Sequence, residues 1–158
     1  MTVKHIFLLV LIIVLAGCAQ EDAGAPQEAA GQAAEDAKET AATVADPAEV
    51  AARVAAADPE NGKRLYIYCQ ACHTLNSGGP NKVGPNLYGV VNRGAAMAEG
   101  FVFSEPLSNS GLVWDQVTLD AWIENPSRLV PGTTMVFGGI KDPVQRANLI
   151  AYLEQATQ

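Results

Sequence analysis

The segment that most constrains this chain is Cys69-Gln70-Ala71-Cys72-His73. Two thiols separated by two residues at the end of a helix can reach the two vinyl groups of one haem. The histidine that follows lies where its ring can bind the iron axially. The segment therefore predicts covalent attachment of a single c-type haem through Cys69 and Cys72, with His73 as an iron ligand.

Three other interpretations of this segment are weaker. A zinc site needs a fourth ligand, and the predicted mature domain has no further cysteine or histidine. A thioredoxin-like dithiol is expected to follow a buried strand within an alternating strand and helix pattern. The sequence shows no such pattern before Cys69. A structural disulfide between Cys69 and Cys72 is chemically possible in an oxidising compartment. The dithiol and the disulfide both leave His73 without a role.

Methionine is the soft ligand left for the second axial position, because no second histidine remains in the mature domain. Met97 and Met135 are the candidates once Met1 is set aside. Met135 lies in a Pro- and Gly-containing stretch, residues 129–139, that predicts a stiff loop able to wrap a cofactor edge. Met97 is not surrounded by such turn-forming residues. The sequence therefore favours Met135 as the second ligand, with Met97 as the alternative.

The N-terminus predicts export and a lipid anchor. Lys4 and His5 precede an uncharged apolar run over residues 6–16, which is short for a membrane-spanning helix and typical of a signal peptide. The run ends in Leu-Ala-Gly-Cys, which resembles the cleavage box of bacterial lipoproteins. We therefore expect a signal peptide at 1–17 and lipidation of Cys18; an ordinary secretory signal or an uncleaved helix is the alternative.

Residues 18–57 are predicted to be the lipidated cysteine followed by a flexible Ala/Glu-rich tether. After Cys18 this stretch has 17 alanines, no aromatic residue, and eight acids against two bases. Without large apolar side chains such a segment does not offset the entropy of ordering, so we expect it to stay outside any core. Fully extended, its 39 residues reach about 130 Å.

Charge excludes a nucleic-acid partner. The net charge of the chain is −7, and phosphate binding needs clustered Lys and Arg. Residues 58–158 contribute seven bases against nine acids, so most of the acidity lies in the predicted tether.

The remaining residues, 58–158, are predicted to form one all-α domain of three to four helices. Asp58 and Pro59 favour a helix start, with Leu65 and Tyr66 at helical spacing before the cysteines. Thr118 is the expected N-cap of a helix that stops before Pro126. Asp142 is the expected N-cap of a C-terminal helix. On that helix the apolar residues Val144, Ala147, Ile150 and Ala151 are expected to share one face.

Several stretches of this domain resemble the class I cytochrome c family, in its mitochondrial-type branch. They are residues 69–75, 83–90 (Val-Gly-Pro-Asn-Leu-Tyr-Gly-Val), 100–104 (Gly-Phe-Val-Phe-Ser), Trp114, 124–126 (Glu-Asn-Pro), 131–135 (Pro-Gly-Thr-Thr-Met) and 147–153. The resemblance covers nearly all of 58–158. It implies a cytochrome c fold whose helices enclose one covalently bound haem.

The resemblance also assigns roles to individual positions. It implies His73 and Met135 as axial ligands, and Pro85 as the residue whose carbonyl accepts the ring N–H of the histidine. Arg93, Trp114 and Thr133 match positions that hold a haem propionate. Gly62 and Tyr66 match the close crossing of a helix that carries Tyr152.

Three positions depart from the family pattern. Phe103 and Trp122 replace tyrosines, and Leu107 replaces an asparagine. The loss of such hydrogen bonds is expected to alter the reduction potential.

A haem with both axial positions filled predicts an electron carrier rather than an enzyme. The expected donor is a quinol-oxidising cytochrome complex, and the expected acceptor is a terminal oxidase or a photosynthetic reaction centre. The expected location is the periplasmic side of a bacterial membrane.

The candidate docking residues are Lys63, Arg64, Lys82 and Lys141. The alternatives are a haem-based gas or redox sensor in which Met135 dissociates, and an electron-entry subunit of an enzyme.

Overall fold

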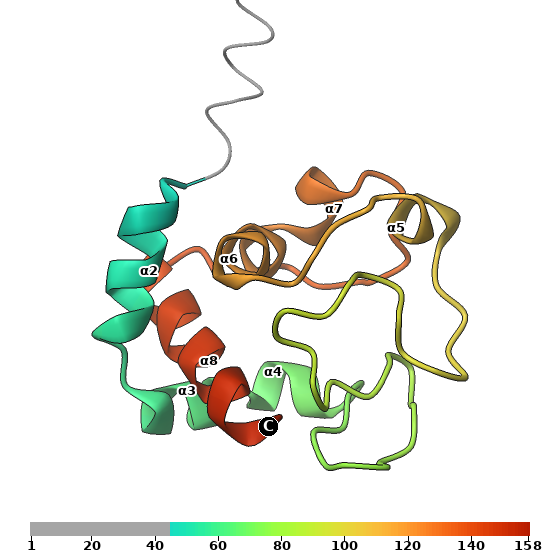
Figure 1. The fold of residues 1–158 in the computed structure, drawn as a ribbon, viewed down its shortest axis with the longest axis horizontal. Coiled ribbons are helices and arrows are strands. Elements are labelled where there is room, and N and C mark those ends of the chain that lie inside the picture. The colour runs from blue at the N-terminus through green and yellow to red at the C-terminus, as the bar shows by residue number, and fades with distance from the viewer. Residues whose placement is uncertain (1–44) are drawn as a thin grey trace, which may run out of the picture.

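The computed structural model describes residues 45–158, so the predicted signal peptide 1–17 and Cys18 lie outside the described residues. The described chain is helical, and its one strand-type pairing within 45–158 is the isolated bridge between Gly94 and Val113. The helices in chain order are α2 (Pro47–Ala55), α3 (Pro59–Leu65), α4 (Ile67–Gln70), α5 (Glu105–Ser108), α6 (Gln116–Glu124), α7 (Pro126–Leu129) and α8 (Pro143–Ala156) (Figure 1). Within residues 45–158, only α2, α3, α6 and α8 exceed one turn. An all-α domain is confirmed.

Asp-Pro pairs start the helices as predicted at two places. The Asp58 carboxylate accepts a hydrogen bond from the backbone N–H of Glu60 at 2.9 Å at the start of α3. Asp142 accepts one from Val144 N–H at 2.8 Å at the start of α8. In each case proline occupies the first turn, where its missing N–H costs no helical hydrogen bond.

The prediction that Thr118 is the N-cap of α6 is wrong. Asp115 caps α6 instead, because its carboxylate accepts the backbone N–H of Thr118 at 2.7 Å. Thr118 is therefore already inside the first turn. The predicted end of this helix before Pro126 is confirmed, since Asn125 is the C-cap.

The chain crosses itself closely where α3 meets α8. A Cβ added at Gly62 would overlap the backbone carbonyl of Asn148, so only glycine allows this approach. One turn further along α3, the rings of Tyr66 and Tyr152 have centroids 5.9 Å apart. The predicted crossing is confirmed.

The predicted shared face of α8 is partly wrong. Ala147, Ile150 and Ala151 are buried as expected, whereas Val144 is 59% exposed. Val144 lies in the first turn of α8, and α3 crosses one turn further along, at Asn148 and Tyr152.

The boundary of the predicted tether at residue 57 is also wrong. Residues 47–55 form α2, which contacts both α6 and α8 and buries Val50 and Val54 at 1% and 6% exposure. Asp46 caps this helix and Pro47 follows it, which is the same Asp-Pro start as in α3 and α8. The alanine-rich composition hid the fact that two valines at i and i+4 are enough to give a short helix a buried face.

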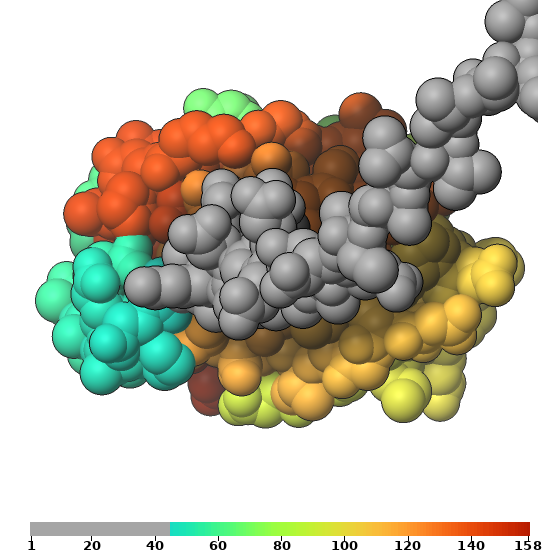
Figure 2. Space-filling model, turned by 90° about the horizontal axis from the view of Figure 1, so that it is seen from above, coloured from blue at the N-terminus to red at the C-terminus, as the bar shows by residue number. Residues whose placement is uncertain are grey.

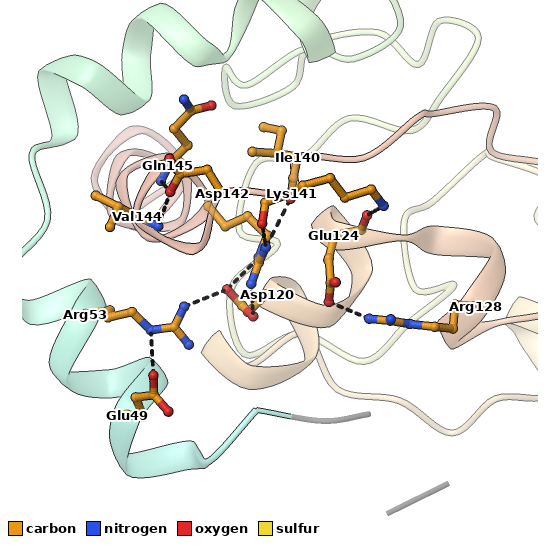
Figure 3. A network of polar contacts seen from close by, with 11 residues as sticks. Glu49, Arg53, Asp120, Glu124, Arg128, Ile140, Lys141, Asp142, Val144 and Gln145 are labelled. Atoms are coloured by element: carbon orange, nitrogen blue, oxygen red, sulfur yellow. Dashed lines mark hydrogen bonds and ion pairs between the residues drawn. The ribbon is translucent and has the colours of Figure 1, made fainter. Parts of the chain in front are cut away.

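A buried ion pair links α6 to α8 (Figure 3). Arg146 donates from Nε to Oδ1 of Asp120 at 2.8 Å and from Nη2 to Oδ2 at 3.0 Å, and both residues are at most 5% exposed. Its Nη1 donates to the carbonyls of Ile140 and Lys141. This bidentate geometry leaves no charge of the pair uncompensated.

The helices of residues 45–158 include none that is long and apolar enough to cross a bilayer.

Gly62→Ala is expected to lower the free energy of unfolding by about 3 kcal/mol, because the new methyl group forces α3 away from α8. Gly138→Ala is the control, since a Cβ there meets nothing within 4 Å. Denaturant unfolding of both variants measures the difference. Equal stabilities would contradict the close crossing.

Asp120→Asn is expected to cost about 3–5 kcal/mol, because it leaves the Arg146 charge buried without its partner. Glu124→Gln is the matched control: its pair with Arg128 is more exposed, so the expected cost is below about 1 kcal/mol. Thermal unfolding compares the two. A control as damaging as Asp120→Asn would show that the buried pair has no special weight.

Candidate functional site

The predicted site residues converge on one largely apolar cavity between α6, α8 and the long loops of the domain. The lining includes all eight: Cys69, Cys72, His73, Pro85, Arg93, Trp114, Thr133 and Met135. They come from three separated parts of the chain, 69–93, Trp114 and 133–135. The fold therefore brings together residues that the sequence had grouped from the haem-attachment motif and from the family resemblance.

His73 is held in one orientation by a single hydrogen bond. Its Nδ1 lies 2.7 Å from the carbonyl oxygen of Pro85. A carbonyl only accepts, so Nδ1 carries the proton and Nε2 keeps its lone pair. Burial lowers the pKa of His73, which also favours the neutral ring, although the Pro85 hydrogen bond acts in the opposite direction. The result is a neutral imidazole with one nitrogen ready to bind a metal.

The backbone around His73 leaves little freedom for the ring. A Cβ at Gly84 would overlap the imidazole, so the ring lies against bare backbone. The hydroxyl of Tyr66 donates to the His73 carbonyl oxygen at 3.0 Å. Both contacts stabilise the position from which His73 faces the cavity.

Cys69 and Cys72 are unpaired, half-buried and part of the cavity wall. Burial, with a smaller contribution from Cys72, raises the pKa of the Cys69 thiol to about 11. A redox dithiol needs a lowered pKa so that it attacks as a thiolate. The environment of Cys69 therefore contradicts the dithiol interpretation and fits a sulfur that lines an apolar pocket.

Both candidate methionines line the cavity, but their surroundings differ. Met97 is 67% exposed, whereas Met135 is partly buried and packs against the hydrophobic core. The backbone N–H of Met135 donates to Oγ1 of Thr133 at 3.3 Å, which steadies the loop that carries it. A ligand sulfur must be held at a fixed place, so burial favours Met135.

Two residues of the cavity lining, Arg93 and Ser104, carry buried polar atoms without a hydrogen-bond partner. Nη1 of Arg93 donates to the Tyr88 carbonyl at 2.9 Å, but its Nε is buried and has no hydrogen-bond partner. The hydroxyl of Ser104, also in the lining, is buried and unpartnered too. Two such donors in an apolar wall fit an anionic group such as a haem propionate. Burial lowers the pKa of the Arg93 guanidinium, which still stays charged.

The rest of the wall is apolar. Buried side chains that line the cavity are Val90, Leu107, Trp114, Leu119, Trp122, Ile123, Leu149 and Leu153. All three positions that depart from the family pattern, Phe103, Leu107 and Trp122, are in the lining. A thiol pair, a neutral imidazole, a thioether and two free donors around apolar walls fit a haem.

Comparison with known proteins agrees with this geometry. The Cytochrome c family model matches residues 59–157. The chain belongs to the cytochrome c family. It is 46% identical to cytochrome c2 of Rhodoblastus acidophilus over 100 residues, covering 63% of this chain and 94% of that protein. It is 40% identical to cytochrome c-554 of Methylosinus trichosporium over 115 residues, covering 73% and 87%.

The solved structure of cytochrome cH from Methylobacterium extorquens has the same fold. It superposes with a TM-score of 0.59 at 44% identity and covers 62% of this chain and 98% of that one. As a cytochrome c, this protein binds one covalent haem c and transfers electrons, and it is not an enzyme. The haem supplies an iron that changes its oxidation state by one electron.

Two features of the site escaped the sequence analysis. Ser104 follows Phe103 in a family-like stretch, but a hydroxyl there is indistinguishable from a surface serine until its burial is known. The apolar walls from α8, Leu149 and Leu153, are spaced by four residues and so share one face. This spacing is present in the sequence and could have identified Leu149 and Leu153 as residues of one buried face.

Tyr66→Phe is expected to change how stability depends on pH. Burial, the largest cause, raises the pKa of Tyr66 to about 12, whereas the unfolded chain has about 10. The unfolded state therefore loses its proton first, and wild type loses stability as the pH rises from 10 to 12. Between pH 8 and 11 this loss is about 1 kcal/mol and is absent in the variant.

Urea unfolding of both haem-loaded proteins at pH 8 and 11 measures the effect. At pH 8 wild type is expected to be more stable by about 1 kcal/mol, because the variant lacks the hydrogen bond to the His73 carbonyl. The difference should nearly vanish at pH 11. A constant difference would contradict the raised pKa.

Proposed function

We propose that this protein is a membrane-tethered c-type cytochrome that carries single electrons between respiratory or photosynthetic membrane complexes. The observation that carries the proposal is the pairing of a neutral, oriented His73 with a partly buried Met135 on one apolar cavity. His73 and Met135 would both bind the iron of a haem held in this cavity. With no position open to substrate, electron transfer through the haem edge is the chemistry that remains.

In this proposal each site residue has a distinct task. Cys69 and Cys72 fix the haem covalently, and His73 and Met135 are the iron ligands. Pro85 sets the orientation of His73 through the 2.7 Å hydrogen bond to Nδ1. Arg93, Trp114 and Thr133 hold the propionates, and Ser104 joins them because its buried hydroxyl has no other partner.

The surface around the cavity mouth supports docking through apolar contacts. The large apolar side chains that are exposed in the lining are Tyr68, Val83, Met97 and Val136. Of the four candidate docking cations, Lys82 alone is next to one of them in the sequence, and its Nζ donates to the Gln70 carbonyl at 2.7 Å. Lys141 Nζ donates to the Glu124 carbonyl at the end of α6. Lys63 and Arg64 are exposed on α3. Docking should therefore depend little on charge steering.

We place the protein on the periplasmic side of a bacterial membrane, with a quinol-oxidising cytochrome complex as donor. A terminal oxidase or a photosynthetic reaction centre is the acceptor. The Leu-Ala-Gly-Cys box at residues 15–18 supports a diacylglyceryl anchor on Cys18. Two acyl chains exceed the single chain that gives only marginal membrane binding. Confinement near the membrane raises the local concentration of the carrier toward the millimolar range, which offsets the sparse charge.

The carrier is expected to exclude carbon monoxide at pH 7 in the reduced form, because Met135 occupies the position that the gas would need. Met135→Ala should bind it, and Met97→Ala should behave as wild type. Visible absorption spectra before and after gas addition measure this. Binding by wild type would favour the sensor instead, in which the methionine dissociates.

Cys18→Ser, placed behind a signal peptide whose cleavage does not require lipidation, is expected to move the protein from the membrane to the soluble periplasmic fraction, because the acyl chains have lost their attachment sulfur. Fractionation followed by haem staining measures the distribution. Asp22→Asn, close to the same cysteine, is the control. Unchanged membrane association of Cys18→Ser would reject the anchor and leave electron transfer standing.

A further inference from the structure

Helix α2 precedes the residues that the family model matches, yet it is an integral part of the folded domain. The match begins at residue 59, whereas α2 spans Pro47–Ala55. Val50 and Val54, one helical turn apart, are 1% and 6% exposed and belong to the main hydrophobic core. They pack this helix onto α6 and α8.

A charge contact adds to this packing. Nη1 of Arg53 lies 3.9 Å from Oδ1 of Asp120, the carboxylate that also accepts two hydrogen bonds from Arg146 (Figure 3). The Arg53 side chain is 19% exposed, so water screens this pair less than a surface pair. Glu49 lies 3.9 Å from Nε of the same Arg53 and helps to orient it. Only a docked α2 places Arg53 against this buried carboxylate.

The docking face of α2 is separate from the haem cavity. Helix α6 turns Leu119, Trp122 and Ile123 to the cavity and Asp120 to α2, and no residue of α2 is in the cavity lining. Figures 1 and 2 both show α2 at one end of the long axis, with the loop around residue 100 at the other. Met97, at the cavity mouth, precedes that loop.

We propose that α2 is the docking segment through which the membrane tether is joined to the haem domain. It holds the tether on the face of α6 and α8 that is turned away from the cavity. This inference rests on the proposed lipid anchor at Cys18. Docking removes residues 46–57 from the free tether and leaves 27 residues after Cys18. The maximal reach then falls from about 130 Å to about 90 Å.

Two consequences follow from this attachment. The attachment point then lies on the α6 and α8 face rather than next to α3 and the haem-binding segment, which places it away from the cavity mouth. The shorter tether also keeps the domain closer to the membrane, which raises its effective concentration there.

The first test is tryptic cleavage after Arg53 in the full-length, haem-loaded protein bound to phospholipid vesicles. We expect the Arg53–Val54 bond to resist cleavage in wild type. In the double variant Val50→Ala, Val54→Ala it should be cut at least tenfold faster, because the cleaved form is the undocked helix. Val144→Ala is the matched control, since this valine is 59% exposed on α8, and its rate should stay within about twofold of wild type.

The second test is the distance of the protein layer from a supported bilayer, measured by neutron reflectometry. The root-mean-square span of a coil of 39 residues exceeds that of 27 residues by about 6 Å. The double variant is therefore expected to lie several Å farther out than wild type and Val144→Ala. Equal distances would overturn the shortened reach.

The outcomes separate this inference from the proposed function. Wild-type cleavage after Arg53 as fast as in the double variant overturns docking, while haem binding and membrane association remain. Loss of membrane association in wild type would reject the anchor and with it the tether role of α2, even if Arg53 stays protected. Protection of Arg53 together with membrane association and the outward shift of the double variant supports the proposal.

Discussion

The domain depends on an apolar interior that the haem shares with the protein. Half of the residues in the main hydrophobic core also line the cavity, among them Trp114, Trp122 and Leu149. A protein interior is close-packed, so side chains around a cavity of this kind gain their dispersion contacts from what fills it. The haem is thus part of the core and of the function at once. This explains why so few regular elements suffice, with only four helices longer than one turn within residues 45–158.

Within this interior, polar chemistry is confined to a few fixed contacts. The hydrogen bond from Nδ1 of His73 to Pro85 selects the tautomer, and the partly buried Met135 would supply the softer donor in the proposed site. The unpartnered donors on Arg93 and Ser104 would hold the negative edge of the haem. Phe103, Leu107 and Trp122, which depart from the family pattern, lie in the same lining, and we expect these replacements to alter the reduction potential.

The haem-attachment segment was predictable because its chemistry is local in sequence, whereas Pro85, Arg93, Trp114 and Thr133 were assigned through the family resemblance. Cys69, Cys72 and His73 lie within five residues, and the Asp-Pro caps at 58 and 142 act within one turn. The pieces that could not be predicted depend on distant partners: Asp120 meets Arg146 across 26 residues, and the burial of Ser104 is decided by the fold. Helix α2 was only partly predictable. Its Asp46-Pro47 start indicated a helix, but the low hydrophobicity of the segment led us to assign it to the tether.

The measurement that tests the account most directly is the near-infrared absorption of the oxidised protein, recorded together with the mass of the purified polypeptide. The account predicts a mass increase of one haem and the weak methionine-to-iron band, retained in Met97→Leu and lost in Met135→Leu. A mass without haem, or a band that survives the loss of the Met135 sulfur, would contradict it.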